Sequence, residues 1–272
     1  EWLISNKFKH WPRTPSGGLA TDADELKKIG KCDPLVEELR NFLSVVRRTR
    51  ILKNLGIGAD GRVRVRTGTF GSITGRNQPS SSVGIWGGAT WIRSLIRPES
   101  GHALWYCDFS GQELAIAACF SGDKRLLEDY ATGDPYMAAA KRFGLVPQYA
   151  TKKDPQFTAV RDRMKVAVGL GVLYGAGAET VAKSGNMKLS QAKHILKLHQ
   201  WTYPTFWEWR TNVILHIRSG ADFESPLGWT YRTSHKDPGN RISNWLMQTT
   251  GSDMLRLATC MASDRGLEIV AM

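Results

Sequence analysis

The sequence has few cysteines and no long apolar run. Its four cysteines, Cys32, Cys107, Cys119 and Cys260, are scattered and form no CxxC pair. This pattern excludes a disulfide ladder, gives no support to a zinc knuckle, and is typical of a reducing, cytoplasmic compartment. Because no segment approaches the about 20 apolar residues that a membrane-spanning helix needs, the sequence also predicts a protein with no membrane partner.

Acidic residues are the minority among the charged side chains. The chain has 37 Lys and Arg against 25 Asp and Glu, a net charge of +12, and its 42% of hydrophobic residues exclude a disordered basic tail. Such a surplus of positive charge favours a polyanionic partner. Basic side chains crowd one segment, Arg47, Arg48, Arg50 and Lys53, which either is a solvated helix end or contacts phosphates.

The chain has neither an initiator methionine nor a signal segment at its start. It begins at Glu1 and stops at Met272, inside an apolar run over 267–272 that is typical of a strand. The sequence therefore predicts a truncated chain that continues beyond both ends. Its 272 residues allow one large domain or two to three subdomains.

Helices dominate the pattern of apolar and polar residues. Two short segments are typical of strands instead: 62–66, in which Arg and Val alternate, and the continuous apolar run 103–107, which we expect to be buried. Asp-Pro pairs are typical helix starts. The predicted helices begin at Asp33-Pro34 and cover 113–120, 123–130, 134–143, 154–173, 190–201, 204–218 and 252–265, with a hairpin around 225–228.

Three groups of residues could carry chemistry. Asp108 directly follows the predicted buried strand, where a carboxylate could bind Mg²⁺ together with substrate phosphates or could simply cap the next helix. Arg161 and Lys165 lie four apart on one helix, so they could hold a triphosphate between them or form a solvated basic face. Asn244 and Gln248, also four apart, could read minor-groove acceptors of DNA or be buried and paired.

In their order and spacing, these residues resemble the motifs of the family A, polymerase I-type, DNA polymerases. The resemblance covers nearly the whole chain, and the phage-type branch of the family is the most similar. The matching segments are Thr74-Gly75-Arg76 for the turn upstream of motif A, 108–114 followed by 121–123 for motif A, Arg161 and Lys165 leading to 171–175 for motif B on the O helix, and Met247-Gln248 with Gly251 and Asp253 for the helix before motif C.

The resemblance implies nucleotidyl transfer from a dNTP to a primer 3′-hydroxyl, with two Mg²⁺ ions as cofactors and primer-template DNA and dNTPs as partners. Asp108 would be one metal-binding carboxylate, with the Phe109 carbonyl as a further ligand. Glu113 would crowd the sugar 2′ position and so favour deoxynucleotides. Arg161 and Lys165 would bind the triphosphate, and Lys165 would also protonate the leaving group. Tyr174 would stack near the templating position. The implied DNA contacts are Arg76, Asn244 and Gln248 with the minor groove, and Arg47, Arg48 and Arg50 with duplex phosphates.

The chain departs from the family pattern in motif B and the fingers. The family places eight positions between the motif B Lys and Tyr, but Lys165 to Tyr174 is nine, so either the helix carries a π-bulge or Lys165 is displaced. The nucleotide-stacking aromatic aligns with Leu170, or with Gly169 counted from Lys165, and neither is aromatic. The fingers His that contacts phosphate in the family appears as Tyr136.

The implied fold is a truncated α+β right-hand polymerase, with an antiparallel palm sheet, helical fingers and part of the thumb. We expect the base of the thumb at 1–55, the palm with motif A at 56–122, the fingers with motif B at 123–240 and further palm at 241–272. The second catalytic Asp, from a His-Asp motif, is expected just after Met272, so we expect this chain to be inactive alone. It would be a monomer in the cytoplasm of a bacterial or phage-infected cell.

Two alternatives to a DNA polymerase stay open. One is a fragment that binds duplex DNA and has no chemistry of its own. The other is an enzyme similar to single-subunit RNA polymerases, which share the Asp, Lys and Tyr-Gly pattern. Glu113 argues against the second, because a 2′-hydroxyl would collide with its side chain.

Overall fold

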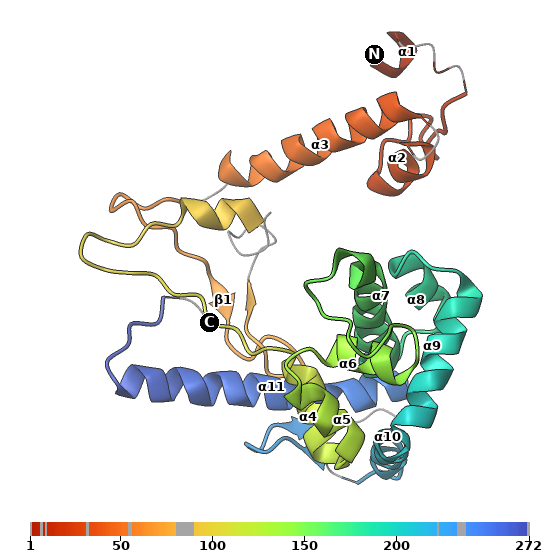
Figure 1. The fold of residues 1–272 in the computed structure, drawn as a ribbon. Helices are drawn as coiled ribbons and strands as arrows, with labels where there is room; N and C mark the ends of the chain where they lie inside the picture. The colour runs from red at the N-terminus through yellow and green to blue at the C-terminus, as the bar shows by residue number, and fades with distance from the viewer. Residues whose placement is uncertain are drawn as a thin grey trace. The chain divides into compact units, whose positions relative to one another are not determined.

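The structure is a computed structural model that describes residues 2–5, 8, 10–30, 33–53, 56–79, 90–221, 223–232 and 238–270. The chain forms two compact units (Figure 1). The first consists of Glu1–Thr67 and Pro79–Trp105, and the second of Gly68–Gln78 and Tyr106–Met272. Within the described ranges, no helix combines the length and the apolar character needed to cross a membrane.

The first unit contains a long helix that starts at the predicted Asp-Pro pair. Helix α3 runs over Pro34–Lys53, and Asp33 Oδ1 accepts a hydrogen bond from the Leu35 amide at 2.9 Å. The Asp33 carboxylate thereby satisfies one of the free amides at the helix start. The unit also contains α1 (Trp2–Ser5), α2 (Ala23–Gly30) and the 3-10 helix η1 (Thr90–Leu95), and its core is formed by Leu3, Trp11, Leu26 and Val36.

The second unit is mostly helical, and the predicted helices form. Asp123 Oδ1 accepts from the Leu126 amide at 3.1 Å and Asp134 Oδ1 from the Met137 amide at 3.3 Å, so both carboxylates cap helices as expected. The last helix is longer than predicted because it begins at Gly239. The helices are α4 (Gln112–Ser121), α5 (Lys124–Ala131), α6 (Pro135–Arg142), α7 (Pro155–Val166), α8 (Ala178–Ser184), α9 (Leu189–Thr202), α10 (Pro204–Arg218) and α11 (Gly239–Asp264).

Two hydrophobic clusters hold this second unit together. The larger one packs residues of α4 to α11 together and includes the buried Met164 and Phe206. In the smaller one, Trp245 of α11 packs with residues of α10 and the 223–231 hairpin. Helix α11 lies along α4 and α10 (Figure 1). This arrangement brings the segment after the 103–110 loop close to the middle of α11.

The predicted helix over 154–173 changes its type part of the way along. Helix α7 ends at Val166, and the chain continues as the π-helix η2 (Ala167–Leu173). The Tyr174 amide donates to the Gly169 carbonyl at 3.1 Å, a bond between residues five apart. A π-turn takes up one extra residue. Of the two explanations for the long spacing between Lys165 and Tyr174, the structure contains the π-bulge.

The predicted strands are mostly wrong. Segment 103–107 is exposed and forms no strand, and the Trp105 side chain is 84% exposed. Segment 62–66 forms one isolated bridge, between Ile57 and Val63, and its Arg62 and Arg64 side chains pair with Glu99 and Asp60. Residues 267–270 form no strand either. The antiparallel palm sheet of the expected fold is therefore not formed by the residues that the structure describes.

Short strand pairs do form at two places. The predicted hairpin around 225–228 is confirmed: β3 (Phe223–Glu224) pairs antiparallel with β4 (Thr230–Tyr231). Its turn closes through a bond of 2.9 Å from the Gly228 amide to the Ser225 carbonyl. The other pair is β1 (Thr67–Gly68) with β2 (Gln78–Pro79).

Candidate functional site

Four of the predicted site residues meet in one cluster of interacting polar side chains, which we call the Glu113 network: Arg76, Glu113, Tyr174 and Gln248. The Arg76 guanidinium donates from Nη2 to Glu113 Oε1 at 2.8 Å. The Tyr174 hydroxyl lies close enough to Glu113 and Gln248 for both side chains to shift its pKa. The four side chains come from the 74–76 turn, the first turn of α4, the end of η2 and the middle of α11. The fold thus brings together all four of the segments that match the family.

The electrostatics of this network keep the Tyr174 hydroxyl protonated. Burial, together with the carboxylate of Glu113, raises the pKa of Tyr174 to about 12, although Arg76 and Gln248 act to lower it. Near neutral pH, Tyr174 is therefore a neutral donor and Glu113 an acceptor. The Glu113 side chain is only 18% exposed and the Arg76 side chain 45% exposed. The carboxylate is therefore fixed at the edge of solvent.

The turn that carries Arg76 is held against α11 through its backbone carbonyls. The indole nitrogens of Trp229 and Trp245 both donate to the Ile73 carbonyl, at 3.1 and 2.6 Å. The Ser252 hydroxyl donates to the Gly75 carbonyl at 3.0 Å, and the Arg256 guanidinium contacts the same oxygen. These contacts fix the direction in which Arg76 leaves the turn, and the sequence had given no sign of them.

Gly75 and its neighbours explain why the turn has this sequence. Gly75 has a φ of +68°, in the left-handed region that glycine adopts without steric cost. The Arg256 guanidinium also lies 3.8 Å from the centroid of the Phe70 ring, a cation–π contact. The Phe70 ring in turn stacks on Trp229 at 5.1 Å. The side chains of Phe70, Trp229 and Arg256 therefore pack together beside the turn.

A close approach of α4 and α11 positions Glu113 relative to Gln248. The Gln112 amide nitrogen donates to the Gly251 carbonyl at 3.1 Å. A Cβ on Gly251 would lie 2.9 Å from Gln112 Oε1, so a larger residue there would require the Gln112 side chain to shift. Glycine at this position accommodates the contact between the two helices without that shift.

The predicted metal ligands Asp108 and Phe109 lie in the loop before α4. Both are exposed. The Tyr130 hydroxyl of α5 donates to the Ser110 carbonyl at 2.8 Å, which fixes the end of this loop. The expected buried strand before Asp108 does not form. The contact from Tyr130 therefore fixes the loop after Asp108, at Ser110. Among the described residues, no three His, Cys, Asp or Glu side chains gather in a way that could hold a metal ion.

Asp108 fits one Mg²⁺ ion better than two. A protein Mg²⁺ site commonly uses one or two carboxylates together with substrate phosphates, so Asp108 and a triphosphate could share an ion. A site with two ions needs a second carboxylate near the first. Asp108 alone would therefore not complete a site for two ions.

The predicted triphosphate contacts lie on α7, but they differ in their surroundings. Arg161 Nε donates to Asp134 Oδ2 at 2.8 Å, and the guanidinium lies 5.9 Å from the centroid of the Tyr136 ring. Lys165 is exposed and pairs with no acidic side chain in the described ranges. Burial raises the pKa of Tyr136, so its hydroxyl also stays protonated. The side chain of Leu170 lies outside what the structure describes.

The structure describes the side chains of most, but not all, of the remaining predicted DNA contacts. Asn244 lies half-buried one turn before Gln248 on α11, and its Oδ1 is buried without a hydrogen-bond partner among the described residues. In the first unit, Arg47 and Arg48 are exposed on α3, and Arg47 donates to the Thr21 carbonyl at 3.0 Å. The side chain of Arg50 is outside the described part of the chain. Exposure leaves Arg48 free to contact a phosphate.

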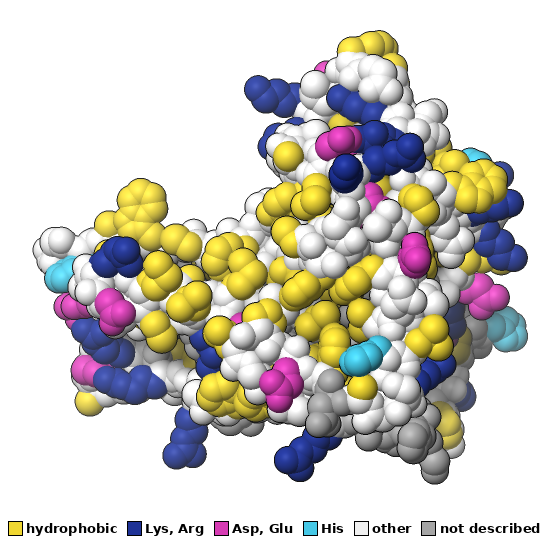
Figure 2. Space-filling model, turned by 90° about the horizontal axis from the view of Figure 1, so that it is seen from below, with side chains coloured by type: hydrophobic (Ala, Val, Ile, Leu, Met, Phe, Trp, Pro, Cys, Tyr) yellow, Lys and Arg dark blue, Asp and Glu magenta, His cyan; other side chains and the backbone are white. Residues whose placement is uncertain are grey.

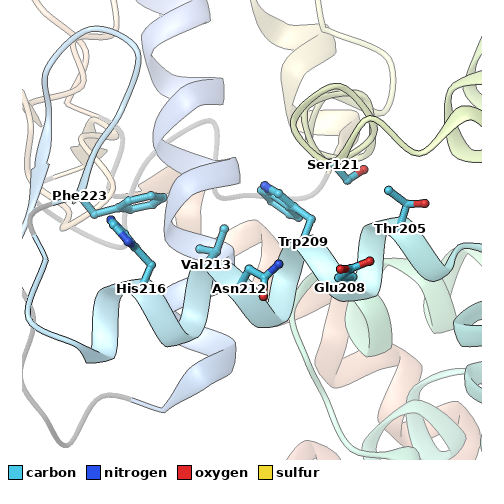
Figure 3. A pocket seen from close by; sticks show the side chains of 8 residues that line it. All are labelled: Ser121, Thr205, Glu208, Trp209, Asn212, Val213, His216 and Phe223. Carbon is cyan, nitrogen blue, oxygen red and sulfur yellow. The ribbon is translucent and has the colours of Figure 1, made fainter.

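A surface pocket of 460 Å³ lies elsewhere, along α10 (Figure 3). Trp209 and Val213 form its apolar floor, and the His216 ring meets Phe223 edge to face at 6.3 Å. None of the predicted site residues lines this pocket. Its lining residues are Ser121, Thr205, Glu208, Trp209, Asn212, Val213, His216 and Phe223.

The positive charge is spread over the surface. Figure 2 shows one face on which hydrophobic side chains are abundant and Lys and Arg side chains lie scattered among them. The net charge of +12 therefore does not gather into a single basic area on this face. Any phosphate contacts there would come from individual side chains.

Comparisons with known proteins agree on one family. The model of "DNA polymerase family A" matches residues 3–268. DNA polymerase I of Aquifex aeolicus is 25% identical over 268 residues, which cover 95% of this chain and 45% of that protein. The DNA polymerase of Mycobacterium phage D29 is 24% identical over 193 residues, which cover 70% of this chain and 29% of that protein. The chain thus spans less than half the length of these relatives.

A solved structure shares the fold. It is the POL domain of Pol1 from M. smegmatis in complex with DNA primer-template and dNTP, with a TM-score of 0.72 and 21% sequence identity. The match covers 98% of this chain and 50% of that one. The mostly helical architecture described above is therefore that of a polymerase domain.

Proposed function

Because this chain belongs to DNA polymerase family A, we propose that it is part of an enzyme that carries out template-directed DNA synthesis, by transfer of a nucleotide from a dNTP to a primer 3′-hydroxyl, and that the chain is inactive alone. The M. smegmatis protein with the same fold was solved with primer-template and dNTP, and we propose the same partners here. The chain has the fold of a polymerase domain and matches the sequence model of the family.

The observation that carries the proposal is the Glu113 network. Arg76, Glu113, Tyr174 and Gln248 are predicted nucleotide or DNA contacts from separate motifs, and the fold brings their side chains together. Side chains that only stabilised separate helices would not need to lie together at one place. Their convergence at the edge of solvent is what a nucleotide-binding site needs.

In this proposal the network forms the sugar and base end of the nucleotide site. Glu113 is anchored by Arg76 and Tyr174, so its carboxylate cannot swing away from an added 2′-hydroxyl, and deoxynucleotides are favoured. The neutral Tyr174 hydroxyl leaves the aromatic ring as a flat surface beside the templating base. Arg76, Gln248 and Asn244 supply donors for the degenerate acceptors of the minor groove.

The triphosphate end is formed by α7. Arg161 and Lys165 share one face of the helix and would bind the phosphates by charge-assisted hydrogen bonds. Lys165, exposed and unpaired by acidic groups in the described ranges, is available to donate a proton to the departing pyrophosphate. Asp108, with the Phe109 carbonyl, would hold Mg²⁺ together with the phosphates; when bound, the metal supplies charge neutralisation at the reacting phosphorus.

The finer parts of the proposal concern subdivision and origin. We assign the thumb base to 1–55, the palm to 56–122 and 241–272, and the fingers to 123–240. We also propose that the polymerase belongs to the phage-type branch and acts as a monomer. The relatives include both bacterial enzymes and a phage enzyme, so the branch rests on motif spacing.

A binding experiment tests the proposal without depending on turnover. The purified chain is mixed with a primer-template in Mg²⁺ buffer, and the affinity of each dNTP is measured at equilibrium. We expect the dNTP that pairs with the templating base to bind at least about tenfold more tightly than the others. Arg161→Ala should weaken the binding of the correct dNTP.

The same titration separates the alternatives. A fragment that only binds duplex would bind primer-template and show no template-dependent affinity for any nucleotide. An enzyme similar to single-subunit RNA polymerases would prefer rNTPs to dNTPs. Either result would overturn the proposal.

A further inference from the structure

An ion pair joins the start of α6 to the middle of α7 and uses both oxygens of one carboxylate. Asp134 Oδ2 accepts from Arg161 Nε at 2.8 Å, while Asp134 Oδ1 accepts from the Met137 amide at 3.3 Å and caps α6. The Asp134 side chain is 15% exposed and the Arg161 side chain 27% exposed. Because the carboxylate is fixed by the helix start, it is a rigid anchor for the guanidinium.

The contact occupies only part of the Arg161 guanidinium. An arginine that pairs fully with a carboxylate makes two parallel bonds, but here only Nε is bonded to Asp134. Nη1 approaches the exposed Asp162 no closer than 3.8 Å. The Nη donors therefore remain for another acceptor, and the Tyr136 ring, 5.9 Å from the guanidinium carbon, limits where the group can turn.

We propose that Asp134 is a positioning residue for nucleotide binding: it holds Arg161 by Nε so that the Nη donors are preset for the triphosphate of the incoming dNTP. This inference rests on the proposed function. Asp134 does not touch the nucleotide. Its effect is to remove rotamer freedom from Arg161 before the dNTP arrives, so that less freedom is lost on binding.

The geometry favours this role over competition between Asp134 and the triphosphate. A competing carboxylate would occupy the Nη groups, which a phosphate also needs, and would have to leave before the dNTP could bind. The bond through Nε and the separate use of Oδ1 in the helix cap let Asp134 stay in place. Removing its charge should therefore weaken nucleotide binding, whereas competition predicts tighter binding.

The test is the equilibrium affinity of the complementary dNTP for the chain bound to primer-template. Asp134→Asn keeps the helix cap, since Asn caps as well as Asp, but removes the charge. We expect the dNTP dissociation constant to rise about three- to tenfold, with the dissociation constant of primer-template unchanged. In an Arg161→Ala background the same change should alter the dNTP constant less than about twofold, because the two residues act through one contact.

Asp154→Asn is the matched control. Asp154 begins α7 with the same Asp-Pro pair, and its carboxylate bonds Thr151 and not Arg161. We expect this variant to leave dNTP affinity unchanged.

Each result decides between the ideas. If Arg161→Ala weakens dNTP binding but Asp134→Asn does not, or strengthens it, the positioning role is wrong and the proposed function stands. If Arg161→Ala has no effect, the assignment of Arg161 to the triphosphate is wrong, and the inference fails with it. Equal losses of dNTP affinity for Asp134→Asn and Asp154→Asn would show that the loss does not depend on the contact with Arg161, and the positioning role would be wrong.

Discussion

Acid should destabilise the helical second unit through one buried histidine, His199. The ring is 1% exposed, its Nδ1 accepts a bond of 3.1 Å from the Trp207 indole, and its Nε2 has no partner among the described residues. Burial lowers the pKa of His199 to about 3, whereas an unfolded chain has a histidine pKa of about 6.5. Below pH 6.5 the unfolded state therefore binds a proton that the folded state does not bind, and the free energy of unfolding falls as the pH falls.

The magnitude follows from the distance of the working pH from the unfolded pKa. At pH 5, which lies between the two pKa values, His199 should reduce the free energy of unfolding by roughly 1.5 × 1.4, or about 2 kcal/mol, relative to its value well above pH 6.5. The loss continues down to about pH 3 and then levels off. The His199 ring packs against Phe143, Tyr203 and Phe206, and no charged group appears among the causes that set its pKa.

Urea unfolding at pH 7.5 and pH 5 measures this effect. His199→Gln can still accept the Trp207 bond but does not titrate, so the stability loss between the two pH values should be about 2 kcal/mol smaller than in the wild type. His194→Gln, on the exposed side of the same helix, should retain the wild-type loss. Identical losses in the wild type and His199→Gln would refute the reasoning.

Three further predictions concern the site and the charge. Glu113→Ala should narrow the preference for dNTP over rNTP, measured as a ratio of dissociation constants in the complex with primer-template; an unchanged ratio would remove Glu113 from the sugar pocket. In primer extension by the polymerase, Lys165→Ala should slow nucleotide transfer by about 100-fold, as expected for loss of a proton donor, and a larger defect from Arg163→Ala would mean that the π-helix has changed the register. Primer-template affinity should fall with salt with a log–log slope of about −0.9 for each phosphate contact, and Arg48→Ala should remove about one contact; a salt-independent affinity would contradict a role for the charge in DNA binding.

The helices were predictable because their signals are local. Asp123 and Asp134 each cap a helix through the amide three residues ahead, a contact that depends on no other part of the chain. The second oxygen of Asp123 shows the limit of this reasoning. It accepts from the Phe206 amide at 3.2 Å, at the start of a helix 83 residues away, and nothing in the sequence indicates that one carboxylate serves two helices.

The strands failed for the opposite reason. An apolar run such as 103–107 has the composition of a buried strand, but a strand exists only where another segment offers its backbone groups. Segment 103–107 forms no strand in the structure, and its Trp105 and Tyr106 side chains are 84% and 72% exposed. Composition alone therefore gave the wrong prediction of burial for this segment.

The candidate site divides in the same way. The side chains that meet in the Glu113 network were predictable as a group, because the order of the motifs identifies Glu113, Tyr174 and Gln248 together. The groups that hold them were not, because Trp245 and Ser252 act on the backbone carbonyls of the 73–75 turn. A carbonyl acceptor is the same at every residue, so no sequence pattern marks which one an indole or a hydroxyl will reach.

The π-helix shows how an irregular sequence can preserve a site. In a regular α-helix, one residue added between Lys165 and Tyr174 would rotate everything beyond it by about 100°, and Tyr174 could not reach the partners it has. The observed turn absorbs the addition, since the bond from the Tyr174 amide to the Gly169 carbonyl spans five residues. Arg161 still faces Asp134 at one end while Tyr174 meets Glu113 and Gln248 at the other. The added residue therefore changes the backbone between the two halves of the site, and it leaves both sets of contacts in place.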